Sequence, residues 1–294
     1  MGGFDEAAAH ALGVSDKHLI RLSAHNLIQK ISGSEVDATQ RYRLLETLRE
    51  FALTQLTARE ALHEALSDTR TKLAAHYAGV IRGFVQDNAA DTAPALRYLT
   101  FHLDNLRNAL RWLLQGQANE AEDKALVMSS SLFSLWLNKG LYREGLEWME
   151  QATAQESGFY QINDLADAHY RAGFLASQIG EPRCQQHFAR ARELYEQTGN
   201  RIGLGRLFGV LGMLSRYPGN QRRTGQLLQI SLDYLREIGP SNHLYFTLCQ
   251  MGYLHLEITG DGQQAETYFL GGAPGCSYPK SHAFATGRKV SIPI

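Results

Sequence analysis

The histidines and cysteines of this chain do not occur at spacings typical of catalytic or metal sites. The 11 histidines are scattered, and His63-Glu64 is followed by Ala-Leu-Ser, so the H-E-x-x-H zinc motif is absent. Cys184, Cys249 and Cys276 are too few and too far apart for a disulfide framework or a metal quartet. We therefore expect no enzyme activity, no metal and no cofactor, and reduced thiols in a cytoplasmic protein.

The chain also has no glycine-rich loop that could hold a nucleotide phosphate. The sequence G-x-x-x-x-G-K-[ST] does not occur in it. Gly203-Leu204-Gly205 resembles a piece of a dinucleotide-binding loop, but no strand pattern precedes it. A bound nucleotide is therefore not expected for these residues.

Basic side chains near the N-terminus are the candidates for contact with nucleic acid. Arg41 and Arg43 would be the first choices for such a contact. The other charged residues of the segment are Lys17, Arg21, Lys30, Asp5, Glu6, Asp16, Glu35 and Asp37. These ten charges cancel, and the whole chain carries a formal net charge of −1, so attraction to phosphates would be weak. DNA contact is therefore the alternative function and not the first prediction.

Three sets of glycines recur at spacings of 39 to 41 residues in the second half of the chain. They are Gly140, Gly180, Gly219 and Gly260, then Gly199 and Gly239, and finally Gly173, Gly212 and Gly252. The first two sets follow apolar-periodic segments and fit helix C-caps. The third set lies inside predicted helices, where glycine costs about 1 kcal/mol against alanine, so we expect close helix approach there. The pattern predicts a stack of helical hairpins.

Apolar spacing within these segments supports the hairpins. Apolar residues recur every three or four positions in 165–179 and in 190–197. One hairpin cannot bury its apolar face alone, so neighbours must stack, and such arrays present a concave groove for a protein or a small effector. The candidate groove residues are His169, Tyr170, Arg171, Arg206 and Arg216.

Residues 1–60 show an order of helix, strand, turn, strand and helix. Ser15-Asp16 can cap a helix that continues through Leu19 to Ile28, and Ser32-Gly33-Ser34 indicates a turn. Arg41–Leu45 reads as a strand, and the helix after it has Leu45, Leu48, Phe51, Ala52 and Leu56 on one face. This is the layout of the later part of a winged helix. A further amphipathic helix is predicted from the leucines at 99, 103, 106, 110 and 113.

Several of these strings resemble one family of regulators. Residues 41–59, RYRLLETLREFALTQLTAR, closely resemble the winged-helix segment of the signal-transduction ATPases with numerous domains, the STAND class. Residues 2–5 resemble the phrase that begins an inner helix of the nucleotide module. Residues 103–112 resemble the family's helix that leads into the repeats, and residues 140–148 resemble its first hairpin. The hairpins after residue 165 resemble long tetratricopeptide repeats, and the likeness covers about residues 2–270.

The resemblance implies a regulator in which an effector bound to the repeats releases a nucleotide switch. It also implies a winged helix that packs against the nucleotide module and not against DNA. Departures matter here, because the phosphate loop and the first helix of the winged helix are both missing. We therefore expect the downstream portion of such a regulator, with a nucleotide-binding module encoded upstream as a partner.

The predicted fold class is mainly all-α, a partial winged helix followed by an α-solenoid of tetratricopeptide-like hairpins. The expected domains are a partial winged helix at 1–60, a helical linker at 61–123, a repeat array at 124–270 and a disordered or non-native tail at 271–294. The first prediction for function is a non-enzymatic module that binds a protein partner or a small-molecule effector. Without a signal peptide or a membrane-spanning segment, it is expected in the cytoplasm and not at a membrane.

Overall fold

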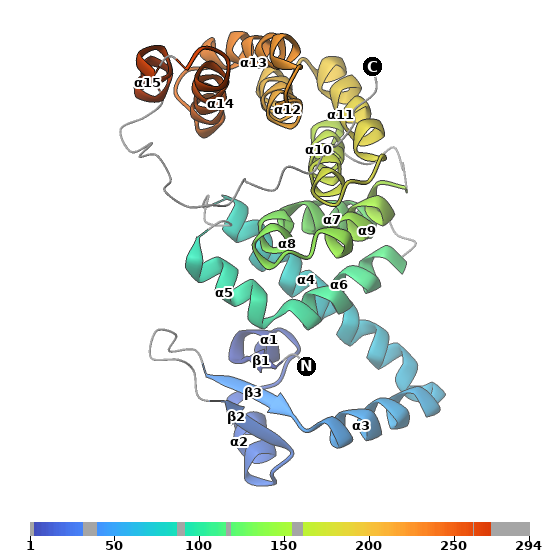
Figure 1. Ribbon diagram of the computed structural model, residues 1–294. Helices are drawn as coiled ribbons and strands as arrows, with labels where there is room; N and C mark the ends of the chain where they lie inside the picture. Colours follow the sequence, from blue (N-terminus) through green and yellow to red (C-terminus); the bar gives the residue numbers. More distant parts are fainter. Residues whose placement is uncertain are drawn as a thin grey trace. The chain divides into compact units, whose positions relative to one another are not determined.

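The structure is a computed structural model that describes residues 3–31, 40–86, 92–115, 119–154, 161–260 and 262–271. Helices make up most of these residues, and a small three-stranded sheet lies near the N-terminus (Figure 1). The prediction of a mainly all-α fold is confirmed. The chain divides into two compact units, residues 1–159 and residues 160–294, called unit 1 and unit 2 below.

The first part of unit 1 is a small layer of strands and helices, called the N-terminal layer. Its elements are β1 (Phe4–Asp5), α1 (Glu6–Ala11), α2 (Asp16–Ala24), β2 (Ile28–Ile31) and β3 (Arg41–Leu44). The sheet order is β1-β3-β2 and both strand pairs are antiparallel. With α3 (Glu46–Ala58) after β3, the predicted order of helix, strand, strand and helix is confirmed.

The helix predicted to continue through Ile28 is shorter than expected. It ends at Ala24 because Asn26 has a φ of 54°, in the left-handed region that stops a helix. Ile28 belongs instead to β2, where it pairs with Leu44 of β3. Ile28 then joins Ala9, Leu19 and Tyr42 in the buried core of the N-terminal layer.

Helices complete unit 1. After α3 and a short 3-10 helix (Glu60–Leu62) come α4 (His63–Gln86), α5 (Ala93–Phe101), α6 (Leu103–Gln115), α7 (Asn119–Ser131), α8 (Phe133–Lys139) and α9 (Tyr142–Thr153). The amphipathic pattern of leucines is confirmed as buried at Leu99, Leu106 and Leu110, but His102 interrupts the predicted single helix. The apolar face predicted for α3 is only partly covered, since Leu48, Ala52 and Leu56 are half-buried and Phe51 is 64% exposed.

Unit 2 is a series of helix pairs. Its helices are α10 (Ile162–Gln178), α11 (Cys184–Thr198), α12 (Arg201–Leu214), α13 (Gln221–Arg236), α14 (Asn242–Thr259) and α15 (Gly262–Gly271). Each even-numbered helix packs against the next one, and α12 also contacts α14 (Figure 1). The predicted hairpins are therefore present in this part of the chain.

The recurring glycines occupy two kinds of position, turns with a positive φ and points of close contact inside helices. The glycines of the first two sets all have positive φ, from 65° to 98°. The C-cap prediction is confirmed at Gly140, Gly199 and Gly260, and Gly180 follows the C-cap of α10 directly. It is wrong at Gly219, which lies beyond Ser215, the C-cap of α12, and just before α13 begins. A Cβ on Gly173 would lie 2.8 Å from the Phe188 ring, and one on Gly212 would lie 2.6 Å from Leu228. The predicted close approach of the two helices of each pair is confirmed at these positions.

The two units divide the chain differently from the expected domains. Helices α7, α8 and α9 contact α4, α5 and α6, so residues 119–154 belong to unit 1, whereas we expected the repeat array to begin at 124; the domain boundaries stay a prediction. The predicted tail beyond Gly271 lies outside the described residues. Within the described ranges, no helix is both long enough and apolar enough to cross a membrane.

Candidate functional site

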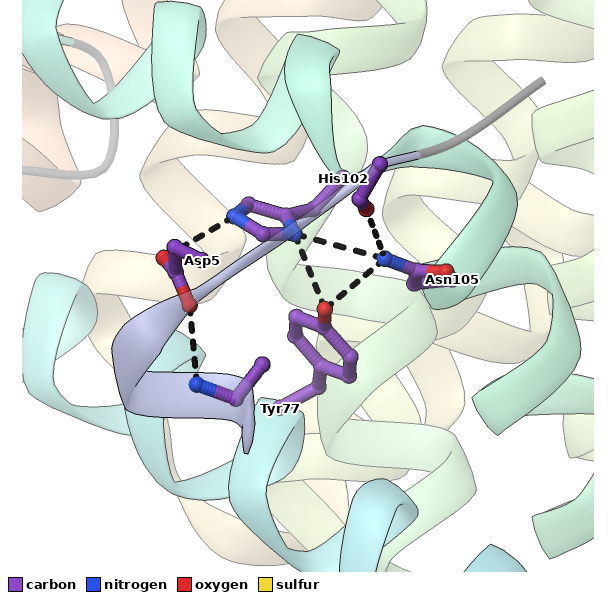
Figure 2. A network of polar contacts seen from close by, with 6 residues as sticks. Asp5, Tyr77, His102 and Asn105 are labelled. Atoms are coloured by element: carbon purple, nitrogen blue, oxygen red, sulfur yellow. Dashed lines mark hydrogen bonds and ion pairs between the residues drawn. The ribbon is translucent and has the colours of Figure 1, made fainter. Parts of the chain in front are cut away.

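A buried network of polar side chains joins the N-terminal layer to the helices of unit 1 (Figure 2). His102, between α5 and α6, donates from Nε2 to Asp5 Oδ2 at 3.2 Å, and the Tyr77 hydroxyl donates to His102 Nδ1 at 2.8 Å. Asn105 Nδ2 donates to the Tyr77 hydroxyl at 2.9 Å and to the Gly3 carbonyl at 2.8 Å. Asp5 Oδ1 also accepts from the Ala8 N–H at 2.8 Å, which caps α1.

The hydrogen bonds of this network indicate which of its side chains carry a proton. Burial by itself raises the pKa of the Asp5 carboxyl, but hydrogen bonds from His102 and the Ala8 N–H bring it below its ordinary value. Burial raises the pKa of Tyr77 far above its ordinary value, so the phenol keeps its proton. An ionised Asp5 and a protonated Tyr77 fit an imidazole that carries its proton on Nε2.

The same groups could relay a proton if a substrate reached them, but the site is closed. Asp5, Tyr77 and His102 are each no more than 2% exposed. Their role is therefore to hold β1 against α4 and α6, with every member of the network supplied with partners. Sequence reasoning missed this cluster, and the only local signal was the polar residue pair His102 and Asn105 inside a leucine-rich helix pattern.

The two arginines chosen as DNA contacts lie on the sheet face opposite the core of the N-terminal layer. Tyr42 is buried in that core, so its neighbours Arg41 and Arg43 point to the other face by strand alternation. The Arg41 guanidinium lies over the Phe101 ring, 4.0 Å from its centroid, and is half-buried. Arg43 is exposed. No measurement of the structure tests DNA contact at either residue.

Among the described residues of the N-terminal layer, the exposed charges are mainly basic; Glu35 and Asp37 lie outside the described residues. Asp5 is buried, and Glu6 is half-buried and accepts from the Tyr42 hydroxyl at 3.1 Å. Among the described residues of this layer, Asp16 is the one exposed carboxylate, and it pairs with His10 Nε2 at 2.8 Å. The exposed cations are Lys17, Arg21, Lys30 and Arg43. Two of them, Lys17 and Arg21, lie four residues apart on α2.

Arg206 and Tyr170, two of the candidate groove residues, belong to one cluster between α10 and α12. Arg206 forms an ion pair with Asp167 and donates to the Tyr195 hydroxyl at 2.8 Å. Its guanidinium lies 4.9 Å from the centroid of the Tyr170 ring. Only 16% of the Arg206 side chain is exposed, so these residues hold neighbouring helix pairs together.

The other groove candidates also have partners within unit 2. His169 is 9% exposed, and its Nδ1 lies 3.0 Å from Nδ1 of His187. Burial, with His187 and Arg190 adding to it, lowers the pKa of His169 to about 4. Arg216 donates to Gln250 at 3.1 Å and pairs with Glu257 at 3.3 Å. Arg171 is half-buried, and ligand binding at these residues stays a prediction.

A small cavity lies near Arg216, one of these candidate residues. This cavity, of about 50 Å³, lies beside α12 and α13, and its lining includes Ser215, Tyr217 and Arg223. That volume holds a water molecule or a small ion. Within the part of the chain that is described, no three histidine, cysteine or carboxylate side chains gather as metal ligands.

Comparisons with known proteins give a class of relatives but no family. No family model matches the sequence, and no solved structure matches it. Curated proteins from Mycobacterium bovis and from two strains of Mycobacterium tuberculosis, each named "Putative HTH-type transcriptional regulator", are 28% identical to it over 273 residues. The match covers 86% of this chain and 29% of each relative, so the chain spans less than a third of their length.

The names of these relatives are those of transcription regulators and not of enzymes. They agree better with the alternative prediction, a DNA-binding regulator, than with an effector-binding module. The resemblance to the STAND class and to tetratricopeptide repeats stays a prediction, because neither the relatives' names nor a family model addresses it.

Proposed function

We propose that this chain is part of a transcription regulator and that it contacts DNA through α2. The observation that carries the proposal is the exposed basic face of this helix, which presents Lys17 and Arg21 four residues apart. Helices α1 and α2 are joined by residues 12–15, as in a helix-turn-helix, in which the second helix enters the major groove. The names of the curated relatives support the same function.

The charge balance that argued against DNA changes when burial is considered. Asp5 is buried under His102, and Glu6 is held by the Tyr42 hydroxyl, so neither presents a free carboxylate to a phosphate. The exposed side chains Lys17, Arg21 and Lys30 can then neutralise backbone phosphates; the exposed carboxylate among the described residues of this layer, Asp16, is paired with His10, and Glu35 and Asp37 lie outside the described residues. Arg41 is less suited to this role because it already lies over Phe101.

Binding of labelled duplex DNA at several salt concentrations tests this proposal. We expect Lys17→Ala with Arg21→Ala to weaken binding and to reduce the slope of log K against log salt by about 2, one unit for each lost phosphate contact. The matched control is Arg222→Ala with Arg223→Ala, two adjacent exposed cations on α13, which should leave the slope unchanged. Absence of duplex binding by the unchanged chain, or equal effects of both double variants, would overturn the proposal.

A second candidate function is binding of a protein or small effector by unit 2, without catalysis. The observation that favours it is Tyr217, a 43% exposed aromatic next to Arg216, because exposed aromatic and arginine side chains are enriched in binding sites. A photo-crosslinking amino acid placed at Tyr217 should capture one defined partner in cells, whereas the same amino acid at the exposed Ile202 should not. Equal capture at both positions would count against this function. Titration of this chain with ATP should show no binding, since the nucleotide-binding module expected from the resemblance would be a separate partner.

A further inference from the structure

The exposed face of α2 includes one large apolar side chain. Positions 17, 20, 21 and 24 follow one side of the helix, and Ile20 on that side is 65% exposed. Leu19, on the opposite side, is 2% exposed and packs against Ala9, Ile28 and Tyr42. Ile20 is therefore not needed for the core. Its neighbours along α2 are the exposed cations Lys17 and Arg21 and, four residues before it, the exposed carboxylate of Asp16, which pairs with His10.

Local hydrogen bonds hold α2 in place so that this face is presented in one orientation. Asp16 accepts from His10 Nε2 of α1 at 2.8 Å, across the turn between the two helices. Ser15, at the N-cap, donates its backbone N–H to His18 Nδ1 at 3.2 Å. At the other end the helix stops at Ala24, before Asn26 turns the chain into β2.

We propose that Ile20 contacts the C5-methyl group of a thymine in the major groove, which deepens the proposed function and rests on it. A branched apolar side chain cannot donate or accept a hydrogen bond, so it can recognise a base only by an apolar contact. The thymine methyl is the apolar group that base pairs present in the major groove. Lys17 and Arg21, on the same face as Ile20, can reach phosphates beside such a contact, and the Asp16 carboxylate on the other side of Ile20 is held by His10. An apolar protein partner would have to bury the two cations.

Substitution of deoxyuridine for thymidine isolates this contact, because uracil lacks the methyl group and keeps the same hydrogen-bonding edge. Duplexes that bind the full chain are first selected from a random-sequence pool and then resynthesised with uracil in place of thymine. We expect the unchanged chain to bind the uracil duplex about fourfold more weakly for each thymine contacted, which corresponds to about 0.8 kcal/mol for one buried methyl group.

The variant Ile20→Ala should bind thymine and uracil duplexes equally well and keep the salt dependence of the unchanged chain. Ile258→Ala, at another exposed isoleucine (51%), is the matched control and should keep the preference for thymine. Circular dichroism checks that both variants remain folded, as expected for exposed positions.

Each outcome separates this inference from the proposed function. Equal binding of thymine and uracil duplexes by the unchanged chain would overturn the role of Ile20 and leave DNA binding through α2 intact. A preference for thymine that persists in Ile20→Ala would likewise overturn the role of Ile20, because another residue would then contact the methyl group. Failure to select any duplex would overturn both.

Discussion

Asp5 shows how the surroundings of one residue decide its role. In the sequence it is one more acidic charge near a basic segment, but its side chain is 2% exposed and bound to His102 and the Ala8 N–H. Arg41 likewise reads as a free basic charge in the sequence, but its guanidinium lies over the Phe101 ring. Arg43 has the same chemistry on the same strand and remains exposed. Residue type therefore limits the possible roles, and burial selects among them.

Replacing Asp5 by alanine should strongly destabilise unit 1. The change removes the partner of a buried imidazole and the N-cap of α1, so we expect a loss of about 2–4 kcal/mol in the free energy of unfolding. Urea denaturation followed by tryptophan fluorescence measures it, because all three tryptophans (112, 136 and 148) lie in unit 1. Asp16→Ala, at an exposed carboxylate, is the control and should cost much less; similar losses would contradict the importance of the network.

His169 predicts an acid-sensitive unit 2. Its pKa is about 4 in the folded chain, against about 6.5 when exposed in the unfolded chain, and burial also lowers the pKa of His243 to about 4. The unfolded state binds more protons between these values, so stability is full above pH 6.5 and falls as the pH drops toward 4. Denaturation at several pH values, followed by circular dichroism, should show this decline and a flatter dependence in His169→Gln. The control is His25→Gln. If His169→Gln showed the same pH dependence of the free energy of unfolding as this control and the unchanged chain, His169 would not be the source of the acid sensitivity.

At the scale of the elements, the glycines inside the helices of unit 2 set the distance between paired helices. Gly173 faces the ring of Phe188 on α11, and Gly252 faces the ring of Phe269 on α15. The same period therefore places a large apolar residue of the second helix against a glycine of the first. In contrast, Gly79 within α4 has open space where a Cβ would be.

The substitution Gly173→Ala should destabilise unit 2, although alanine is the better helix former. The added Cβ would lie 2.8 Å from the Phe188 ring, and overpacking of this kind costs about 1–3 kcal/mol. Gly79→Ala is the matched control, which should gain about 1 kcal/mol from helix propensity alone. Denaturation followed by circular dichroism gives both values, and a gain in stability for Gly173→Ala would contradict the close packing.

The last helix pair should open more readily than the first pair of unit 2. Among the described side chains of α15, only Ala265 is fully buried, and Ile258 near the end of α14 is 51% exposed. We expect amides in 254–270 to exchange hydrogen faster than those in 165–195, because fewer apolar contacts hold them. Mass spectrometry of deuterium uptake would show the difference, and equal protection would count against it.

At the scale of the whole molecule, the division into two units has a thermodynamic consequence. Each unit has its own buried residues, such as Leu106 and Trp136 in unit 1 and Leu207 and Leu232 in unit 2. Units with separate cores can unfold separately, so one free energy of unfolding need not describe the chain.

We expect urea transitions measured by tryptophan fluorescence and by circular dichroism to differ. Fluorescence reports unit 1 alone, whereas circular dichroism reports the helices of both units. Gly173→Ala should therefore shift the circular dichroism transition and leave the fluorescence midpoint unchanged. One coincident transition that moves as a whole in this variant would show that the units unfold together.

The sequence by itself determined the helical hairpins, the strand at 41–44 and the glycines at which two helices approach closely. These features depend on local backbone preference and on apolar periodicity, which neighbouring residues carry. It also indicated the helix at 46–58, but not that its apolar face is only partly buried.

Only the tertiary structure decided which distant residues meet. His102 binds Asp5 from 97 positions away, and Arg107 reaches Glu144 through two hydrogen bonds of 2.6 and 2.7 Å that join α6 to α9. The place of Ile28 was also decided in this way, since it pairs with Leu44 in the sheet instead of continuing α2. Such contacts depend on how elements pack in space, and a pattern along one segment carries no information about its distant partner.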